Sequence, residues 1–203
     1  MTTIQSLDTQ LLLLINKGLA NPLFDVLMPF LSFQGYLLVV PFLFYIIVQG
    51  YNRKDAAEKR YLIKAIVTIA IACLSVYLAD LAEHLIKDAV GRVRPCTAIE
   101  GIRLIVACPK SFSMPSGHAF SSFAFATPLV YLTRQYVSKA WRAYPLVLAS
   151  LIALSRPYLG VHYPTDILAG AMMGSAIGLG LSWGYENLIK KNYLPRRTRS
   201  ARS

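Results

Sequence analysis

Long apolar runs separated by short polar connections make up most of the chain. The runs cover residues 26–52, 61–82, 116–133, 143–154 and 165–185, and few charged side chains interrupt them. A helix needs about 20 mainly apolar residues to cross the hydrocarbon core of a bilayer. The pattern therefore predicts an all-α protein, a polytopic transmembrane helical bundle of about five to six spans.

The first run has two interpretations because Gly35 and Pro41 interrupt it. It is either a short half-buried helix followed by a span, or one tilted and kinked span. Ahead of it, apolar residues at helical spacing over residues 3–19 predict an amphipathic helix that lies in the membrane interface. This segment lacks a basic start and a cleavage site, so we do not expect a cleaved signal peptide.

The last apolar run carries glycine at every fourth position, at Gly170, Gly174 and Gly178. On a helix these positions share one face. Small residues at this spacing let two helix backbones approach closely. We therefore expect this run to pack tightly against another helix.

Composition supports a membrane protein and changes the interpretation of the charge. The chain has 55% hydrophobic and 15% charged residues, which is too apolar for an ordinary soluble protein of this size. In a soluble protein, the net charge of +11 would suggest nucleic acid as a partner. In a membrane protein, positive charge instead collects in short cytoplasmic loops, so no nucleic-acid partner is expected.

The distribution of charge predicts an orientation in the membrane. Residues 51–60, 134–142 and 186–203 together hold 13 Lys and Arg against three acids, whereas residues 80–117 and 155–166 hold six against five. The positive-inside rule places the first set, including the C-terminus, in the cytoplasm. The second set is then expected on the outer face of the membrane.

The three cysteines fall in two settings. Cys73 lies inside an apolar run and is expected to pack in the core. Cys96 and Cys108 share one polar connection, and their spacing does not suggest a zinc site. Both a disulfide and two free thiols are compatible with the sequence, and a disulfide requires that the connection face an oxidising compartment.

Ionisable residues between the apolar runs are the candidates for chemistry, because they are costly in a membrane-like setting. Asp80, Glu83 and His84 are interpreted as a solvated helix end. The other candidates combine cations, histidines and a predicted helix start: Lys87, Arg94, Ser116, Gly117, His118, Arg156, His162 and Asp166. This combination suits a bound phosphate, because arginine pairs bidentately with phosphoryl oxygens and a helix N-terminus offers backbone N–H groups, here at Ser116 and Gly117.

The two histidines can divide the work of phosphate transfer. Asp166 follows His162 by four residues and can hold its imidazole in one tautomer, which makes His162 the expected nucleophile. His118 is then left as the general acid. We expect no metal and no cofactor, because no carboxylate cluster resembles a magnesium site.

The three segments together resemble the signature of the type 2 phosphatidic acid phosphatase (PAP2) superfamily. The signature reads KxxxxxxRP at residues 87–95, PSGH at 115–118 and SRxxxxxHxxxD at 155–166, with every defining residue present. The resemblance implies an α-helical bundle and a phosphohistidine on His162, with His118 as the acid. It also implies that the phosphate ligands are Lys87, Arg94, Ser116, Gly117 and Arg156. Vanadium haloperoxidases are similar in these motifs but soluble, which the apolar runs argue against.

The resemblance divides the chain into three parts. Residues 1–60 hold the interfacial helix, the first span and a cytoplasmic loop, residues 61–185 the catalytic core, and residues 186–203 a basic cytoplasmic tail. The small size resembles bacterial members of the family, which implies the inner membrane as the location and an active site on its outer face.

The function expected is removal of a terminal phosphate from a lipid mono- or diphosphate. Undecaprenyl diphosphate is the first expectation and lipid A 1-phosphate the second, with phosphatidylglycerol phosphate and phosphatidic acid as further candidates. The alternative is a lipid-phosphate carrier or transporter without turnover. The sequence does not indicate an oligomeric state.

Overall fold

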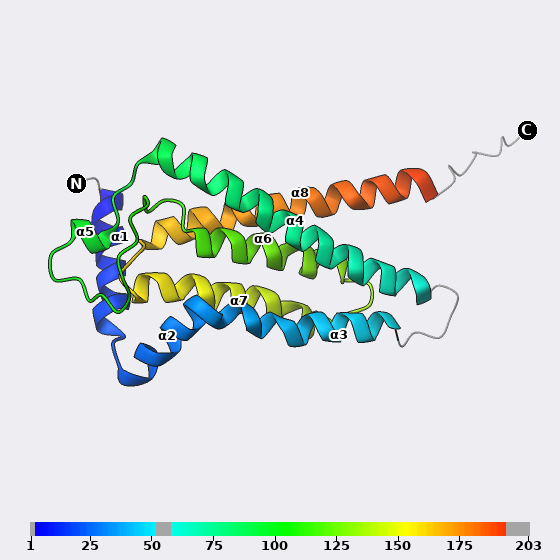
Figure 1. The fold of residues 1–203 in the computed structure, drawn as a ribbon, viewed down its shortest axis with the longest axis horizontal. Helices are drawn as coiled ribbons and strands as arrows, with labels where there is room; N and C mark the ends of the chain where they lie inside the picture. Colours follow the sequence, from blue (N-terminus) through cyan, green and yellow to red (C-terminus); the bar gives the residue numbers. More distant parts are fainter. Residues whose placement is uncertain (1–2, 52–57, 194–203) are drawn as a thin grey trace, which may run out of the picture.

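The computed structural model describes residues 3–51 and 58–193, which form helices and connections without any strand (Figure 1). The α-helices are α1 (Thr3–Leu13), α2 (Pro22–Gln34), α3 (Val40–Tyr51), α4 (Glu58–Val90), α5 (Pro95–Ala98), α6 (Gly117–Leu132), α7 (Lys139–Tyr158) and α8 (Pro164–Tyr193). A π-helical turn, η1 (Leu14–Gly18), and a 3-10 turn, η2 (Gly35–Val39), complete the set. The expected all-α bundle is confirmed.

Helix α6 is the centre of the bundle, and α4, α7 and α8 pack around it. The glycines of α8 make its contact with α6 close, as expected. A Cβ atom at Gly174 would clash with the carbonyl of Phe120, and one at Gly170 would lie 2.6 Å from the carbonyl of Ser116. The two backbones therefore touch, and this contact fixes the start of α6 relative to α8.

The first apolar run forms two consecutive helices with a break between them. Helix α2 begins after Asn21, whose side chain accepts a hydrogen bond from the Phe24 N–H, and Pro22 occupies the first helical position. The break is the 3-10 turn η2, which starts at Gly35. Residues 22–51 together form one candidate span, which agrees with the kinked alternative.

The outer surface of the bundle is apolar along much of its length. Within the described residues, three stretches are long and apolar enough to cross a membrane: Pro22–Tyr51, Tyr61–Ala98 and Pro164–Ile189. On α4, Tyr77, Leu81 and Leu85 are exposed, with Leu85 reaching 75%. An exposed apolar belt of this kind is stable in lipid but not in water. The chain is a membrane protein, and the expected total of five to six spans remains a prediction.

The connections that carry Arg94 and His162 meet at one end of the bundle, where α1 lies across the helix ends (Figure 1). The connection from α4 to α6 and the short one from α7 to α8 are both at this end. The end of α3, the start of α4 and the connection from α6 to α7 are at the opposite end. The separation of the two sets of connections is as expected, and their sides of the membrane remain predictions.

Three expectations need correction or fall outside the described residues. Cys73 is exposed on α4 rather than packed in the core, because it points away from the neighbouring helices. Helix α8 continues to Tyr193, so the boundary expected at residue 185 falls inside a helix. The basic residues expected in the loop and tail lie partly outside the described residues, namely Arg53, Lys54, Arg196, Arg197, Arg199 and Arg202.

Candidate active site

Most of the predicted site residues line one cavity of about 570 Å³ at the end of the bundle where α1 lies. Those on its wall are Lys87, Arg94, Gly117, His118, Arg156 and His162. Ser116 and Asp166 are not among the lining residues and lie fully buried behind them. The structure thus brings together side chains from α4, α6, α7 and the two connections.

His162 reaches the cavity because the chain turns sharply after α7. That helix extends to Tyr158 and includes Ser155 and Arg156, so the segment expected as a connection is helical at its start. Gly160 then has φ +79°, a conformation in which a side chain is strained, and its missing side chain also makes room for the carbonyl of Arg103. The turn brings His162 back between the end of α7 and the start of α8.

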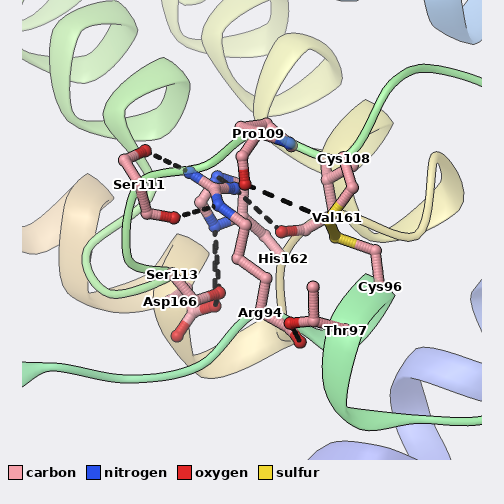
Figure 2. The surroundings of a disulfide bond; sticks show 10 residues. All are labelled: Arg94, Cys96, Thr97, Cys108, Pro109, Ser111, Ser113, Val161, His162 and Asp166. Carbon is pink, nitrogen blue, oxygen red and sulfur yellow. Dashed lines mark hydrogen bonds and ion pairs between the residues drawn. A yellow bond between two sulfur atoms is a disulfide. The ribbon is translucent and has the colours of Figure 1, made fainter.

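Asp166 lies beside His162 in the first turn of α8. Its Oδ2 is 3.5 Å from His162 Nδ1, and the same oxygen accepts hydrogen bonds from Ser113 Oγ at 2.5 Å and from the Tyr163 N–H at 2.9 Å. Asp166 is therefore held by several donors and directed at Nδ1 (Figure 2).

The neighbours of His162 define its tautomer. Arg94 Nη1 lies 3.0 Å from His162 Nε2. A guanidinium can only donate, so Nε2 must be the acceptor and the ring proton resides on Nδ1, facing Asp166. Burial lowers the pKa of His162 from 6.5 to about 4, and the hydrogen bond to Asp166 offsets only part of this effect. At neutral pH, His162 is therefore uncharged, and its Nε2 lone pair accepts the hydrogen bond from Arg94, which has to move aside before Nε2 can attack a substrate.

Arg94 is held in place by the connection that follows α5. Its Nε donates to the Ser111 carbonyl at 2.6 Å, and its Nη2 donates to Ser111 Oγ at 3.0 Å. Nη1 also donates to the Val161 carbonyl at 3.0 Å. Figure 2 shows Arg94 between Ser111 and His162. These bonds fix the guanidinium beside Nε2, although they leave it few free donors for a phosphate.

Arg156 has more unused hydrogen-bonding capacity. Its Nη1 donates to Ser32 Oγ on α2, while its buried Nε has no hydrogen-bond partner among the described residues. The His118 ring hydrogen-bonds to the backbone of the same Ser32. A buried donor without a partner is costly, and a bound anion would satisfy it.

The start of α6 differs from the expected anion site in one respect. We expected a free N–H at Ser116, but this group donates to the Asp166 carbonyl at 3.0 Å and so ties α6 to α8. The buried Ser116 Oγ lacks a hydrogen-bond partner within the described part of the chain. The group of Ser116 without a partner is therefore its hydroxyl rather than its backbone N–H, and it lies behind the cavity wall.

Glu83 was interpreted as part of a solvated helix end, and this is wrong. Its carboxylate pairs with Lys87 Nζ at 2.5 Å, lines the cavity and lies directly against Gly117, where a Cβ atom would collide with it. Asp80 and His84 are exposed as expected, although Asp80 also contributes to the cavity wall. Glu83 differs from Asp80 and His84 because it lies one turn before Lys87, on the side of α4 that faces α6.

Sequence reasoning missed three polar residues that support the site. Asp8 on α1 and Arg92 after α4 form an ion pair of 2.6 Å, and Ser113 binds Asp166. Arg92 lies inside the first motif, two residues before Arg94, so its position was a usable signal. Asp8 and Ser113 belong to separate segments and carry no spacing that relates them to His162.

The connection between α4 and α6 contains a disulfide between Cys96 and Cys108, whose Cα atoms are 6.0 Å apart (Figure 2). Of the two alternatives left by the sequence, the structure contains the bridge. It closes the segment between Arg94 and Ser111, two residues that hydrogen-bond to each other. The described residues contain no group of three or more His, Cys, Asp or Glu side chains that could hold a metal ion.

An apolar groove of about 280 Å³ adjoins the cavity. The two share the residues Tyr36, Ser121, Ser122 and Ile152. Beyond these, aliphatic and aromatic side chains from η2, α4, α6 and α7 line the groove, among them Val39, Val76, Phe125 and Leu148. The cavity that holds the predicted site residues thus shares part of its wall with a groove lined mainly by apolar side chains.

Comparison with known proteins agrees with the resemblance seen in the motifs. The family model described as the PAP2 superfamily matches residues 68–190. A lipid A 4'-phosphatase of Bacteroides thetaiotaomicron is 32% identical over 180 residues, which are 84% of this chain and 73% of that protein. An undecaprenyl-diphosphatase of Sulfolobus acidocaldarius is 30% identical over 104 residues, which are 51% of this chain and 48% of that protein.

A solved structure shares the fold over nearly the whole chain. It is the crystal structure of a transmembrane PAP2-type phosphatidylglycerolphosphate phosphatase from Bacillus subtilis, with a TM-score of 0.69 and 22% identity. The match covers 95% of this chain and 90% of that one. It extends the likeness to the N-terminal helices, which the family model does not include.

Proposed function

The chain belongs to the PAP2 superfamily, and from this premise we propose that it is a membrane enzyme that removes a terminal phosphate from a lipid through a phosphohistidine on His162. The observation that carries the proposal is the state of His162. It is buried, uncharged, fixed as the Nδ1–H tautomer by Asp166 and Arg94, and part of the wall of a cationic cavity. These are the properties of an activated nitrogen nucleophile.

The reaction has two steps in this proposal. First, the Nε2 lone pair attacks phosphorus, the bond between phosphorus and the lipid oxygen breaks, and His118 gives its proton to that oxygen. Second, a water molecule loses a proton to His118 and attacks phosphorus, the phosphorus–nitrogen bond breaks, and inorganic phosphate leaves. Arg94, Arg156 and Lys87 stabilise the charge on the phosphoryl oxygens.

The apolar groove supports a lipid as the substrate. A phosphate bound in the cavity has its hydrocarbon part directed to the adjoining groove, because the two spaces share part of their walls. Binding sites for such amphipathic ligands combine an apolar surface with a few polar groups that fix the orientation. The exposed apolar surface of the bundle gives a lipid access from the bilayer.

The acidic residues of the cavity favour a phosphate linked to a sugar. Asp80 and Glu83 line it, with Glu83 paired to Lys87, so Asp80 is the carboxylate that can accept hydrogen bonds from hydroxyl and amide groups and repel a second phosphate. The sugar of a lipid A phosphate has such donors, whereas the head of undecaprenyl diphosphate has only phosphates. We therefore rank a lipid A phosphate first, which reverses the order expected from the sequence. The relative that covers 84% of the chain is a lipid A 4'-phosphatase, which agrees with this ranking.

Release of inorganic phosphate by the purified protein tests the proposal. The assay compares lipid A, undecaprenyl diphosphate, phosphatidylglycerol phosphate and phosphatidic acid, in excess EDTA because no step uses a metal. We expect release, fastest from lipid A, and none from the His162→Ala or His118→Ala variants. Release that stops in EDTA and returns with magnesium would contradict the mechanism. Binding without release would instead identify a carrier.

A further inference from the structure

Helix α1 contributes a buried carboxylate that reaches toward the active site. Asp8 is only 3% exposed, although the helix that carries it lies at the end of the bundle. Its Oδ1 accepts the Thr165 N–H at 3.0 Å, and its Oδ2 lies 2.6 Å from Arg92 Nη2. The match to the PAP2 family model begins at residue 68, so Asp8 lies outside the region that it covers.

Arg92 connects Asp8 to Asp166. One nitrogen of its guanidinium, Nη2, binds Asp8, and the other, Nη1, binds Asp166 Oδ1 at 2.6 Å and Thr165 Oγ1 at 2.7 Å. The guanidinium also lies 4.0 Å above the Tyr163 ring. Asp166 in turn has its other oxygen, Oδ2, beside His162 Nδ1. A continuous chain of contacts therefore runs from Asp8 through Arg92 and Asp166 to His162.

The geometry of Arg92 depends on its two carboxylates. With both present, each takes one nitrogen of the guanidinium, and Asp166 keeps Oδ2 for the imidazole. Arginine and a single carboxylate prefer a bidentate pair. If Asp8 loses its charge, Arg92 can turn both nitrogens toward Asp166 and compete with His162 for Oδ2.

The charges along this series of contacts, from Asp8 to His162, also suit the proposed reaction. Asp8 and Asp166 supply two negative charges against the one positive charge of Arg92, and resting His162 is neutral. When His162 attacks phosphorus, its ring gains positive charge. Asp166 then stabilises that ring against the neighbouring Arg94, and Asp8 balances the positive charge that Arg92 places beside Asp166.

We propose that Asp8 is a positioning residue for phosphate transfer, which acts through Arg92 to keep Asp166 aligned with His162 and so makes α1 part of the catalytic unit. The proposal rests on the proposed role of His162 as nucleophile. It concerns the chemical step, so it predicts a slower transfer without weaker binding of phosphate.

The test compares Asp8→Asn, Asp8→Glu and the matched control Asp88→Asn, which removes an exposed acid from α4. The readouts are kcat, KM, the rate of phosphoenzyme formation and inhibition by orthovanadate as a phosphate analogue. In Asp8→Asn we expect kcat and the rate of phosphoenzyme formation to fall by roughly tenfold or more, as when partners that orient a reactive imidazole are removed. KM and vanadate inhibition should stay within about twofold, Asp8→Glu should recover part of the loss, and Asp88→Asn should match the wild type.

A double-mutant cycle tests the route through Arg92. If Asp8 acts through Arg92, Asp8→Asn should cause little further loss in an Arg92→Gln background, where no buried guanidinium is left unpaired. Additive losses would overturn the proposal, and so would an unchanged kcat in Asp8→Asn or a parallel loss of vanadate binding. The same assays report wild-type phosphoenzyme, so failure of the proposed nucleophile would be seen separately.

Discussion

The protonation state of His162 follows from a competition between two effects on one imidazole. Asp166 favours the charged ring, whereas burial and the cationic arginines disfavour it, and burial has the larger effect. The result is a pKa of about 4 rather than 6.5. A buried imidazole near a carboxylate is thus kept neutral and reactive, and the carboxylate stabilises the charge only when it develops.

This state predicts how His162 titrates. The chain has three histidines, so histidine-selective NMR can follow each, with His162→Ala as the assignment variant. Because the pKa is lowered, the ring should stay neutral as the pH falls through 6.5 and take up a proton only near 4. The unfolded chain binds that proton first, so His162 makes acidification destabilising between these values. A midpoint near 6.5 would show that His162 is not buried as described.

At the residue scale, the sequence predicted the cations and histidines of the cavity wall but not the polar groups behind them. Lys87, Arg94, His118, Arg156 and His162 follow a spacing that phosphate chemistry makes informative, and the structure places them around one cavity. Their supports depend on tertiary contact. Asp8, Ser32 and Ser113 come from three other segments, so no spacing connects them to the motifs.

The packing of α8 on α6 is the contact between elements that positions the site most directly. Ser116 begins α6 and binds the backbone of Asp166 on α8. Gly170 and Gly174 of α8 allow this approach, because their positions face backbone atoms of α6. A shift of one helix would move His118 relative to His162.

Matched glycine substitutions test this contact. Gly174→Ala places a Cβ against the Phe120 carbonyl, and such overpacking should cost about 1–3 kcal/mol. Gly180 lies on the same helix with nothing within 4 Å of its Cβ position, so Gly180→Ala should be neutral or slightly stabilising. Thermal unfolding in detergent measures both, and equal stability of the two variants would argue against close packing.

The connection after α4 acts as an element of its own because the disulfide closes it. Cys96 and Cys108 are separated by 12 residues, and closing such a loop restricts the unfolded chain by roughly 3 kcal/mol. The double change Cys96→Ser and Cys108→Ser, or added reductant, should therefore lower the melting temperature more than turnover at room temperature. Mass spectrometry of unreduced peptides checks the bridge itself, and two alkylatable thiols in fresh protein would contradict it.

Among the elements, helices were easier to predict than their ends. The apolar runs predicted α4, α6 and α8, because a segment in a bilayer must satisfy its backbone hydrogen bonds internally and is therefore helical. The run containing α2 and α3 left two alternatives, because Gly35 and Pro41 show that the run is interrupted but not whether its two parts cross the membrane together. The extension of α7 through Arg156 was hidden, because Pro157 and the polar residues around it resemble a connection.

At the scale of the whole molecule, the expected separation of the connections fits the architecture. The candidate active site is at one end of the bundle and the most basic connections are at the other. The positive-inside rule therefore predicts that the candidate site faces the outer side of the membrane. The charge pattern could predict the separation because it averages over many residues. It could not predict that α1 lies across the active-site end, since nothing in the segment identifies Asp8 as buried.

Accessibility to an impermeant thiol reagent tests the orientation. In a background without the native cysteines, Glu100→Cys at the active-site end should be labelled in intact cells, whereas Lys139→Cys at the other end should be protected. Both positions are exposed in the fold, so burial does not explain a difference. The reverse pattern would place the active site in the cytoplasm.

The central claim is that phosphate is transferred to His162, and trapping the intermediate tests it most directly. Wild-type protein is quenched in alkali during turnover, digested and analysed by mass spectrometry. We expect a phosphoryl group on His162 that is lost in acid, and none in His162→Ala. Turnover without this modification, or a phosphoryl group on another residue, would contradict the assignment of His162 as nucleophile.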